Sequence, residues 1–154
     1  MTGRTLFLDL DGVFADFEGA VEVLFGTPFA EVPRRAMWKR IQAARGFWSG
    51  LVLLPGADRL WAEVAPFDPV FLTGILPSDR TCVPAKIAWV RRHFRTERVI
   101  CCHSRHKPCH GRPGDVLVDD RAANIDAWTT MGGIGVLHRS VEDTVARLRE
   151  LGYR

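Results

Sequence analysis

The chain has 154 residues, of which 47% are hydrophobic and 25% charged, and its formal net charge is +3. This length and composition predict one compact domain with its own hydrophobic core. No apolar run approaches the roughly 18 residues of a membrane-spanning helix, so we expect no membrane association. The basic surplus is too small to favour nucleic acid as a partner, because proteins that bind nucleic acid concentrate basic residues on one face.

The start of the chain and its cysteines predict a cytoplasmic protein. Residues 1–5 lead directly into a strand-like segment, without the apolar stretch of a signal peptide. The four cysteines, Cys82, Cys101, Cys102 and Cys109, could form two disulfides, but no other feature indicates secretion. We therefore expect reduced thiols in the cytoplasm, and we make no prediction of the oligomeric state.

Five short apolar runs predict the strands of a sheet. They span residues 5–8, 69–74, 98–102, 115–119 and 133–137. Because the runs are apolar almost throughout, we expect strands that are covered on both faces. Helical patterns lie between or after them, at residues 60–64, 84–94 and 140–151. This alternation predicts an α/β fold with a doubly wound, mostly parallel, five-stranded, Rossmann-like sheet, whose ligands bind at the carboxyl ends of the strands.

Residues 13–55 interrupt the alternation of strands and helices. Apolar residues at helical spacing predict one helix from Phe14 to Leu24 and a second from Pro33 to beyond Ile41. The segment is too short to form an independent domain. We therefore expect residues 1–154 to be a single domain with a small helical cap at about residues 13–55, inserted after the first strand as a lid over the crevice.

Two aspartates, Asp9 and Asp11, follow the first predicted strand and precede Gly12. Side chains at positions i and i+2 of an extended chain point to the same side, so both carboxylates can reach one substrate atom. Held close together they would repel each other, and a bound Mg²⁺ would remove that repulsion with the oxygen ligands it prefers. An acidic turn that merely closes a strand is the alternative interpretation.

A second acidic pair, Asp119 and Asp120, follows the fourth predicted strand. Successive side chains of a strand diverge, so we expect one aspartate to ligate the metal and the other to orient water, a lysine or a ligand. Thr73 and Gly74 end the second predicted strand, where a hydroxyl and backbone N–H groups can bind an anion; a simple turn is the alternative there. Three strand-end carboxylates would form the all-oxygen type of site that suits Mg²⁺.

In chain order, these residues resemble the motifs of the haloacid dehalogenase (HAD) superfamily of phosphohydrolases. Residues 9–12 match its D-x-D-G motif after an apolar strand, Thr73 matches its strand-end threonine, and residues 119–120 match its acidic pair. Within the superfamily, four segments look like the 5'(3')-deoxyribonucleotidases: residues 9–18, 54–57, 85–90 and 114–121. The resemblance covers most of the chain up to about residue 125 and departs from the family in the insertion and in a long His- and Gly-rich loop before the fourth strand.

The resemblance implies a Mg²⁺-dependent phosphomonoester hydrolase that acts on a small phosphorylated metabolite, foremost a (deoxy)nucleoside 5'-monophosphate. Asp9 would attack phosphorus as the nucleophile, and Asp11 would protonate the leaving oxygen and later accept a proton from water. Mg²⁺ would be bound by Asp9, by the backbone carbonyl of Asp11 and by one member of the acidic pair, for which we predict Asp120. Asp119 would then have a supporting role, and Thr73 and a lysine would hold the phosphate.

The family's phosphate-binding lysine must be one of the three lysines of the chain, Lys39, Lys86 and Lys107. We predict Lys107, because it lies between the third strand and the acidic pair, as the family's third motif does. Lys86, at the beginning of a predicted helix, is the alternative. Lys39 lies in the insertion, and we expect the basic cluster around it, residues 34–40, to be a solvated helix face.

Aromatic residues of the insertion are candidates for substrate contacts. At helical spacing such residues more often belong to the core, but a short insertion has little core of its own. In the resembled nucleotidases, aromatic residues of the cap stack on the base, a role that we assign to Phe17 and Trp38 and more weakly to Phe47 and Trp48.

Two alternatives to a nucleotidase remain open at this point. A small cap leaves the crevice accessible, so a phosphatase of another metabolite, such as a sugar phosphate, is one of them. The other is a non-catalytic protein that binds a metal or a partner through the Cys- and His-rich residues 101–110. These residues do not have the usual spacing of zinc ligands, so we expect a mobile loop beside the site.

Overall fold

The computed structural model describes residues 3–154, so residues 1–2 of the predicted N-terminal lead-in lie outside the described part of the chain. Five parallel strands form one sheet in the order β3-β2-β1-β4-β5. They are β1 (Leu6–Leu8), β2 (Val70–Gly74), β3 (Val99–Cys102), β4 (Val116–Asp119) and β5 (Ile134–Leu137). Each strand lies within one of the five predicted runs. The prediction of a doubly wound α/β fold with a five-stranded parallel sheet is therefore confirmed.

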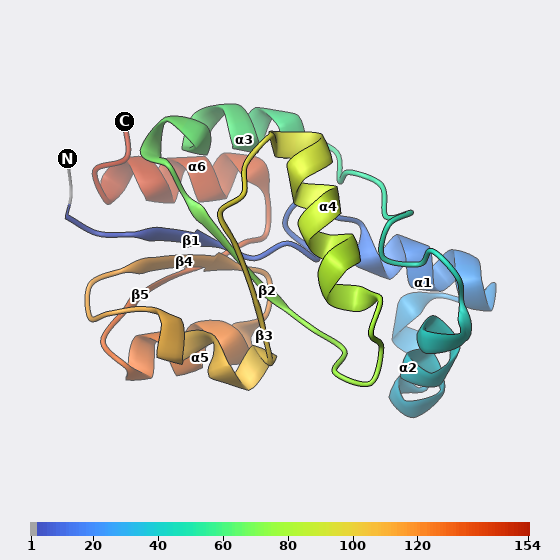
Figure 1. Cartoon of the computed structure of the whole chain (residues 1–154). Helices are drawn as coiled ribbons and strands as arrows, with labels where there is room; N and C mark the ends of the chain where they lie inside the picture. Colours follow the sequence, from blue (N-terminus) through green and yellow to red (C-terminus); the bar gives the residue numbers. More distant parts are fainter. Residues whose placement is uncertain (1–2) are drawn as a thin grey trace.

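Helices cover both faces of the sheet (Figure 1). They are α3 (Ala57–Val64), α4 (Cys82–Phe94) and α6 (Val141–Glu150) on one face and α5 (Ala122–Thr130) on the other. Side chains of β1 alternate between the two faces, as expected for a strand. Leu6 and Leu8 pack in the larger hydrophobic cluster with α3, α4 and α6, whereas Phe7 packs edge-on against Trp128 of α5.

Between β1 and α3 the chain leaves the sheet and passes beyond the carboxyl ends of the strands (Figure 1). This segment contains α1 (Phe17–Phe25), the 3-10 helix η1 (Phe29–Glu31) and α2 (Arg34–Ala43). The carboxylate of Asp16 caps α1 by accepting a hydrogen bond of 2.9 Å from Gly19 N. Both α-helices lie where the sequence predicted two helices, and the division of the chain into a domain and a cap remains a prediction.

Two further 3-10 helices are η2 (Ala65–Phe67), which follows α3, and η3 (Ser104–His110), which follows β3. We expected the Cys- and His-rich segment to be a mobile loop beside the site, but its residues 104–110 form the helix η3. Tertiary contacts hold the segment, because Lys107 in its middle is buried and pairs with two carboxylates.

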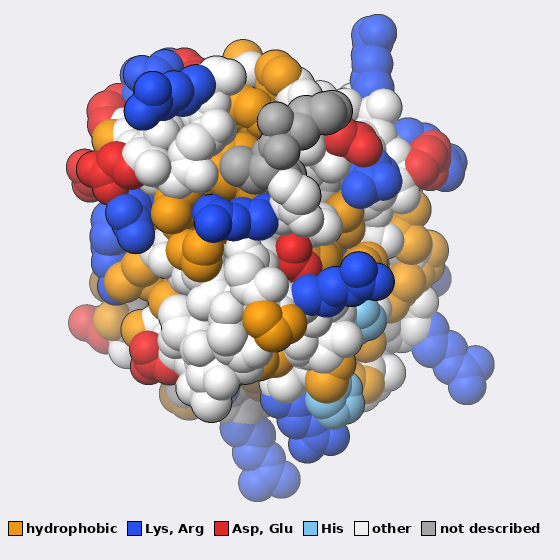
Figure 2. All heavy atoms as spheres, turned by 90° about the vertical axis from the view of Figure 1, so that its left-hand side faces the viewer, with side chains coloured by type: hydrophobic (Ala, Val, Ile, Leu, Met, Phe, Trp, Pro, Cys, Tyr) orange, Lys and Arg blue, Asp and Glu red, His pale blue; other side chains and the backbone are white. Residues whose placement is uncertain are grey.

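No helix in the described part of the chain is long and apolar enough to cross a membrane. Figure 2 shows the face of the molecule on the side of the N-terminus, where acidic and basic side chains are interspersed.

Candidate active site

A pocket of about 550 Å³ lies beside the carboxyl ends of the strands and is also lined by residues of α1, η1 and α2. This volume is in the range of small-molecule sites. One side of the pocket, the charged floor, consists of Asp9, Asp11, Lys86, Lys107 and Asp120. The other side, the aromatic wall, consists of Phe17, Phe29, Trp38 and Trp48.

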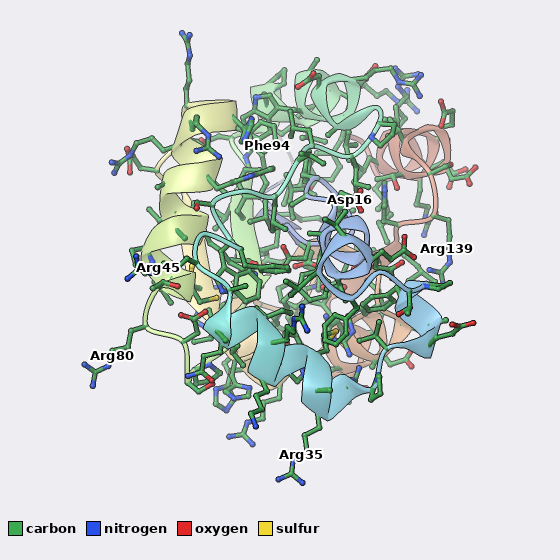
Figure 3. All side chains as sticks on the ribbon, turned by 90° about the vertical axis from the view of Figure 1, so that its right-hand side faces the viewer. Asp16, Arg35, Arg45, Arg80, Phe94 and Arg139 are labelled. Atoms are coloured by element: carbon green, nitrogen blue, oxygen red, sulfur yellow. The ribbon has the colours of Figure 1, made fainter. Side chains whose placement is uncertain are left out.

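Figure 3 views the molecule from the side of α2, which lies at the front of this view. Arg35 of this helix points away from the molecule. Arg35, Lys39 and Arg40 are all exposed, as expected for a solvated helix face. Arg34 is exposed too, but it also lines the pocket.

Asp9 is placed by the sheet itself. It is the first residue after β1, and its backbone N–H donates a hydrogen bond of 2.9 Å to Val118 O, which extends the pairing of β1 with β4. Asp119, the last residue of β4, is fully buried beside it. The sheet therefore brings the two acidic motifs together although they lie more than one hundred residues apart in sequence.

Lys107 joins the two acidic motifs. Its ammonium group donates hydrogen bonds of 2.8 Å to Asp9 Oδ1 and 2.7 Å to Asp119 Oδ2. Burial by itself would lower the pKa of Lys107, but the charges of the two carboxylates outweigh burial and raise the pKa above its usual value. Lys107 is therefore a charged group buried on the charged floor.

Asp119 has hydrogen-bond partners for both carboxylate oxygens. In addition to Lys107, Arg121 N donates to Oδ1 at 2.9 Å, and the side-chain amide of Asn124 donates to both oxygens at 3.1 and 3.0 Å. Burial and the neighbouring charge of Asp9 raise the pKa of Asp119, and Lys107 acts against this shift. Asp119 is thus held in place as a supporting residue.

Asp120 differs from its neighbour. Its Oδ1 atom is buried and has no hydrogen-bond partner among residues 3–154. Burial, followed by the negative charges of Asp9 and Asp119, raises the pKa of Asp120 to about 7. A half-buried carboxylate whose Oδ1 atom is buried without a partner, and whose pKa is raised, lacks a compensating positive charge.

A divalent cation would supply that charge. Asp9, Asp119 and Asp120 each offer one oxygen, and these three oxygens lie within 4.8 Å of one another. In the described chain, no other group of three or more His, Cys, Asp or Glu residues meets this distance. Because the lysine and amide donors already engage Asp119, the residues available to a hard cation are Asp9 and Asp120. The donor set therefore fits Mg²⁺.

Gly12 allows the first motif to approach Asp120. Its φ angle is +82°, a conformation that favours glycine, and a Cβ atom built there would lie 2.1 Å from Asp120 Oδ2. Any other residue would push the carboxylate aside. The glycine of the D-x-D-G motif therefore has a steric role in this site.

Asp11 lines the pocket on the same turn and pairs with Lys86 rather than with Lys107. Lys86 Nζ donates to Asp11 Oδ2 at 2.6 Å, and Asp11 Oδ1 is buried without a hydrogen-bond partner in the described residues. Both lysines that the sequence left as candidates for phosphate binding thus belong to the site, each with a different aspartate.

Thr73 ends β2 as predicted, but it is fully buried and does not line the pocket. Its hydroxyl accepts a hydrogen bond of 3.0 Å from Lys86. Gly74 lines the pocket instead, next to Ser104 of η3, whose Oγ would lie 2.4 Å from a Cβ atom at position 74. The backbone of Gly74, rather than the Thr73 side chain, is therefore the part of this motif that borders the pocket.

The aromatic wall contains three of the four aromatic residues that we predicted. Phe17, Trp38 and Trp48 line the pocket, and the Phe17 ring lies 5.9 Å from Trp38 and 6.0 Å from Trp48, measured between centroids. Phe47 is not among the lining residues and packs edge-on against Trp48. Phe29 of η1 lines the pocket but was not predicted.

Other pocket residues that sequence reasoning missed follow the recognised motifs. They are His103, Ser104, Arg121 and Asn124. Asn124 had a signal, since it lies five residues after Asp119 and a residue of the next helix can reach back to the end of the strand. Ser104 had none, because its place depends on the 3-10 conformation of η3.

In the described residues, the Cys- and His-rich segment does not bring three metal-binding side chains together. All four cysteines are free, and the rings of His103 and His106 lie 5.9 Å apart in an edge-on arrangement. Burial raises the pKa of Cys101 to about 11, which disfavours the thiolate that binds metals. Within the described residues, the three-donor group is the carboxylate cluster and not this segment.

Sequence comparison agrees with the motifs. No protein-family model matches the chain. Mouse (Mus musculus) mitochondrial 5'(3')-deoxyribonucleotidase is 28% identical over 144 residues, which cover 75% of this chain and 64% of the mouse protein. The chain therefore spans less than two thirds of the length of this relative.

Structural comparison agrees with the fold. A haloacid dehalogenase-like family hydrolase from Streptococcus pneumoniae matches with a TM-score of 0.53 and 13% identity over 99% of both chains. A HAD family enzyme from Bacteroides thetaiotaomicron, solved as a magnesium complex, matches with a TM-score of 0.50 and 15% identity over 95% of this chain and 98% of that one. The chain has the HAD fold, and the resemblance predicted from the motifs is confirmed.

Proposed function

We propose that the protein is a Mg²⁺-dependent phosphomonoester hydrolase that works through an aspartyl-phosphate, with nucleoside 5'-monophosphates, above all deoxyribonucleotides, as substrates. The observation that carries the proposal is the meeting of Asp9, Asp119, Asp120 and Lys107 at one end of the sheet. The pKa values of Asp119 and Asp120 are raised, and carboxyl groups with a raised pKa in a pocket, beside a paired lysine, are typical of catalytic sites.

The reaction takes two steps. In the first, a carboxylate oxygen of Asp9 attacks phosphorus, the bond from phosphorus to the ester oxygen breaks, and Asp11 gives its proton to the leaving oxygen. In the second, water attacks phosphorus, the bond from phosphorus to Asp9 breaks, and Asp11 accepts a proton from the water. Phosphate leaves, and both aspartates return to their starting states.

Lys107 can bind the transferred phosphoryl group without leaving its partners. An ammonium group has three N–H donors, and two of those of Lys107 point to Asp9 and Asp119. Among the described residues no third acceptor is present, so one donor remains for a phosphoryl oxygen. This count supports Lys107, with the Gly74 backbone, as the phosphate-binding part of the site.

Asp9, Asp120 and the backbone carbonyl of Asp11 would hold the metal ion. When bound, Mg²⁺ contributes positive charge against the phosphoryl oxygens and offsets the repulsion between the carboxylates. The free Oδ1 of Asp120 is the atom that supports this assignment. Asp119 would keep Asp9 and Lys107 aligned.

The aromatic wall supports a nucleotide rather than a smaller phosphate ester. Phe17, Phe29, Trp38 and Trp48 border the same pocket as the charged floor, and its volume of about 550 Å³ exceeds what a phosphate group needs. Aromatic rings bind bases by stacking. The identity with the mouse deoxyribonucleotidase supports the same substrate class.

Phosphate release from a substrate panel tests the proposal. The panel contains ribo- and deoxyribonucleoside 5'- and 3'-monophosphates, sugar phosphates and p-nitrophenyl phosphate, each assayed with Mg²⁺ and with EDTA. We expect Mg²⁺-dependent release that is fastest with deoxyribonucleotides. Faster release from sugar phosphates than from nucleotides would make sugar phosphates the substrate class. Absence of release from every compound would contradict the proposed hydrolase activity.

A further inference from the structure

Lys86 has no role in the reaction described above, yet it is one of the two buried lysines of the pocket. Its side chain is 2% exposed, and its ammonium group lies on the charged floor next to Asp11. Burying an ammonium group is costly unless it is paired and hydrogen-bonded. The partners of Lys86 therefore indicate what the residue is for.

All three N–H donors of Lys86 are engaged. They point to Asp11 Oδ2 at 2.6 Å, to the Thr73 hydroxyl at 3.0 Å and to the Gly74 carbonyl at 2.7 Å. Lys86 would have to give up one of these bonds to bind a phosphoryl oxygen. Lys107, with two engaged donors, has no such cost.

The position of Lys86 is fixed from several sides. Thr73 and Gly74 belong to the end of β2, and the Trp48 ring covers the ammonium group with a cation–π distance of 4.8 Å. Trp48 is itself held, because its indole N–H donates to Asp79 Oδ2 at 2.8 Å. Lys86 thus presents a fixed donor to a fixed place on the floor.

Asp11 has no comparable support of its own. Within residues 3–154, Lys86 is the only hydrogen-bond partner of its carboxylate, and the other oxygen, Oδ1, has none. The orientation of this carboxylate toward the pocket therefore depends on the bond to Lys86.

We propose that Lys86 is a positioning residue for Asp11, holding its carboxylate where it exchanges a proton with the leaving oxygen and with water. The inference rests on the proposed function, since it assigns Asp11 the proton transfers. An error of about 1 Å in the position of a reacting group costs roughly a hundredfold in rate. Loss of Lys86 should therefore slow the chemical step rather than weaken substrate binding.

Two leaving groups separate positioning from phosphate binding. An alkyl phosphate, such as a nucleoside monophosphate, needs a proton on its leaving oxygen, whereas p-nitrophenolate leaves without one. Lys86→Met keeps the length of the side chain and removes its donors. We expect Lys86→Met to lower kcat for the alkyl phosphate about ten- to a hundredfold, to leave KM nearly unchanged, and to affect p-nitrophenyl phosphate much less.

A double-mutant cycle with Asp11→Asn completes the test. If Lys86 acts through Asp11, Lys86→Met will add about twofold or less to the effect of Asp11→Asn. If the rate losses of the two single variants multiply in the double mutant, the proposal is overturned. An equal rise of KM for both substrates in Lys86→Met would also overturn it, and would make Lys86 a phosphate ligand. Lys39→Met, an exposed lysine on α2, is the matched control and should leave the kinetics unchanged.

Folding and function are checked separately. Thermal unfolding of each variant shows whether it folds, and Lys86→Gln, which keeps an N–H donor, takes the place of Lys86→Met if the latter does not. If the unchanged protein turns over substrate, but the rate losses of Lys86→Met and Asp11→Asn multiply in the double mutant, the positioning role is contradicted and the proposed function is not. Absence of turnover by the unchanged protein contradicts the proposed function and this inference with it.

Discussion

The charged floor and the aromatic wall of the pocket are built in different ways. On the floor, side chains from distant parts of the sequence are joined by ion pairs of 2.6 to 2.8 Å, and both lysines are nearly fully buried. In the wall, the rings of Phe29, Trp38 and Trp48 lie 5.9 to 6.2 Å from the Phe17 ring, measured between centroids, and these contacts are packing contacts. Directional bonds fix atoms for a reaction, whereas packing of rings tolerates different partners. The comparison assigns the chemistry to the floor and the choice of substrate to the wall.

The largest effect should come from the floor. Asp9→Asn removes the nucleophile but keeps the shape of the side chain, so we expect turnover of every substrate to fall by roughly a thousandfold or more. Initial rates of phosphate release measure the loss. Asp126→Asn, at an exposed position on α5, is the control. Turnover by Asp9→Asn equal to that of the unchanged protein would show that Asp9 is not the nucleophile.

Gly12→Ala should disturb the floor without changing a charge. The new Cβ atom would lie 2.1 Å from Asp120 Oδ2, so the carboxylate must move. We expect the affinity for Mg²⁺ to fall about ten- to a hundredfold, as measured by titration calorimetry. Gly26→Ala is a matched control, because Gly26 also has a positive φ angle, +69°, but a Cβ atom there would meet nothing within 4 Å. Equal Mg²⁺ affinity in both variants would contradict the role of Gly12.

The wall should change selectivity instead of chemistry. Trp38→Ala removes one ring of the wall, and stacking on a base is worth about 1–3 kcal/mol. We expect KM for nucleotides to rise about tenfold, while kcat/KM for p-nitrophenyl phosphate changes little. Val23→Ala, an exposed site on α1, is the control. An equal loss for both substrates would show that the wall does not select the base.

The smallest effect concerns pH. With the pKa of Asp120 raised to about 7, the metal-free folded state holds more protons than the unfolded state between about pH 4 and pH 7. Stability from this group is therefore present at low pH and is lost as pH rises through 7. Mg²⁺ binds the deprotonated carboxylate, so its stabilising effect should increase over the same range.

Thermal unfolding with and without Mg²⁺ at pH 5.5 and pH 8 measures this difference. We expect a larger increase of Tm by Mg²⁺ at pH 8 and a much smaller pH dependence of that increase in Asp120→Asn. An equal increase at both pH values in the unchanged protein would show that Asp120 is not the titrating ligand.

Much of the fold could be predicted because its strands are local and almost purely apolar. Each strand lies within its predicted run, and α6 lies within the helical pattern predicted at residues 140–151. Helix α5 was not predicted, because alanine and threonine dominate it and only Trp128 is buried. The conformation of η3 could not be predicted either, since it depends on the tertiary ion pairs of Lys107.

The candidate site divides in the same way. The two acidic motifs were visible because each follows a strand, and parallel strands end at one edge of the sheet. The pairing of Asp11 with Lys86 was not visible in the sequence, because the two residues lie 75 positions apart. Only the packing of α4 against β2 brings them close. The burial of Thr73 could not be predicted for the same reason. The sequence pattern of a strand does not show which neighbouring element will cover the side chain at its end.

The central claim is that Asp9 becomes phosphorylated during turnover, and chemical trapping tests it most directly. Borohydride reduces an aspartyl-phosphate to homoserine, so the protein is quenched with borohydride during turnover of its best substrate, digested and sequenced by mass spectrometry. The account predicts homoserine at position 9, dependent on substrate and on Mg²⁺. Homoserine at another aspartate, with Asp9 unmodified, would contradict it.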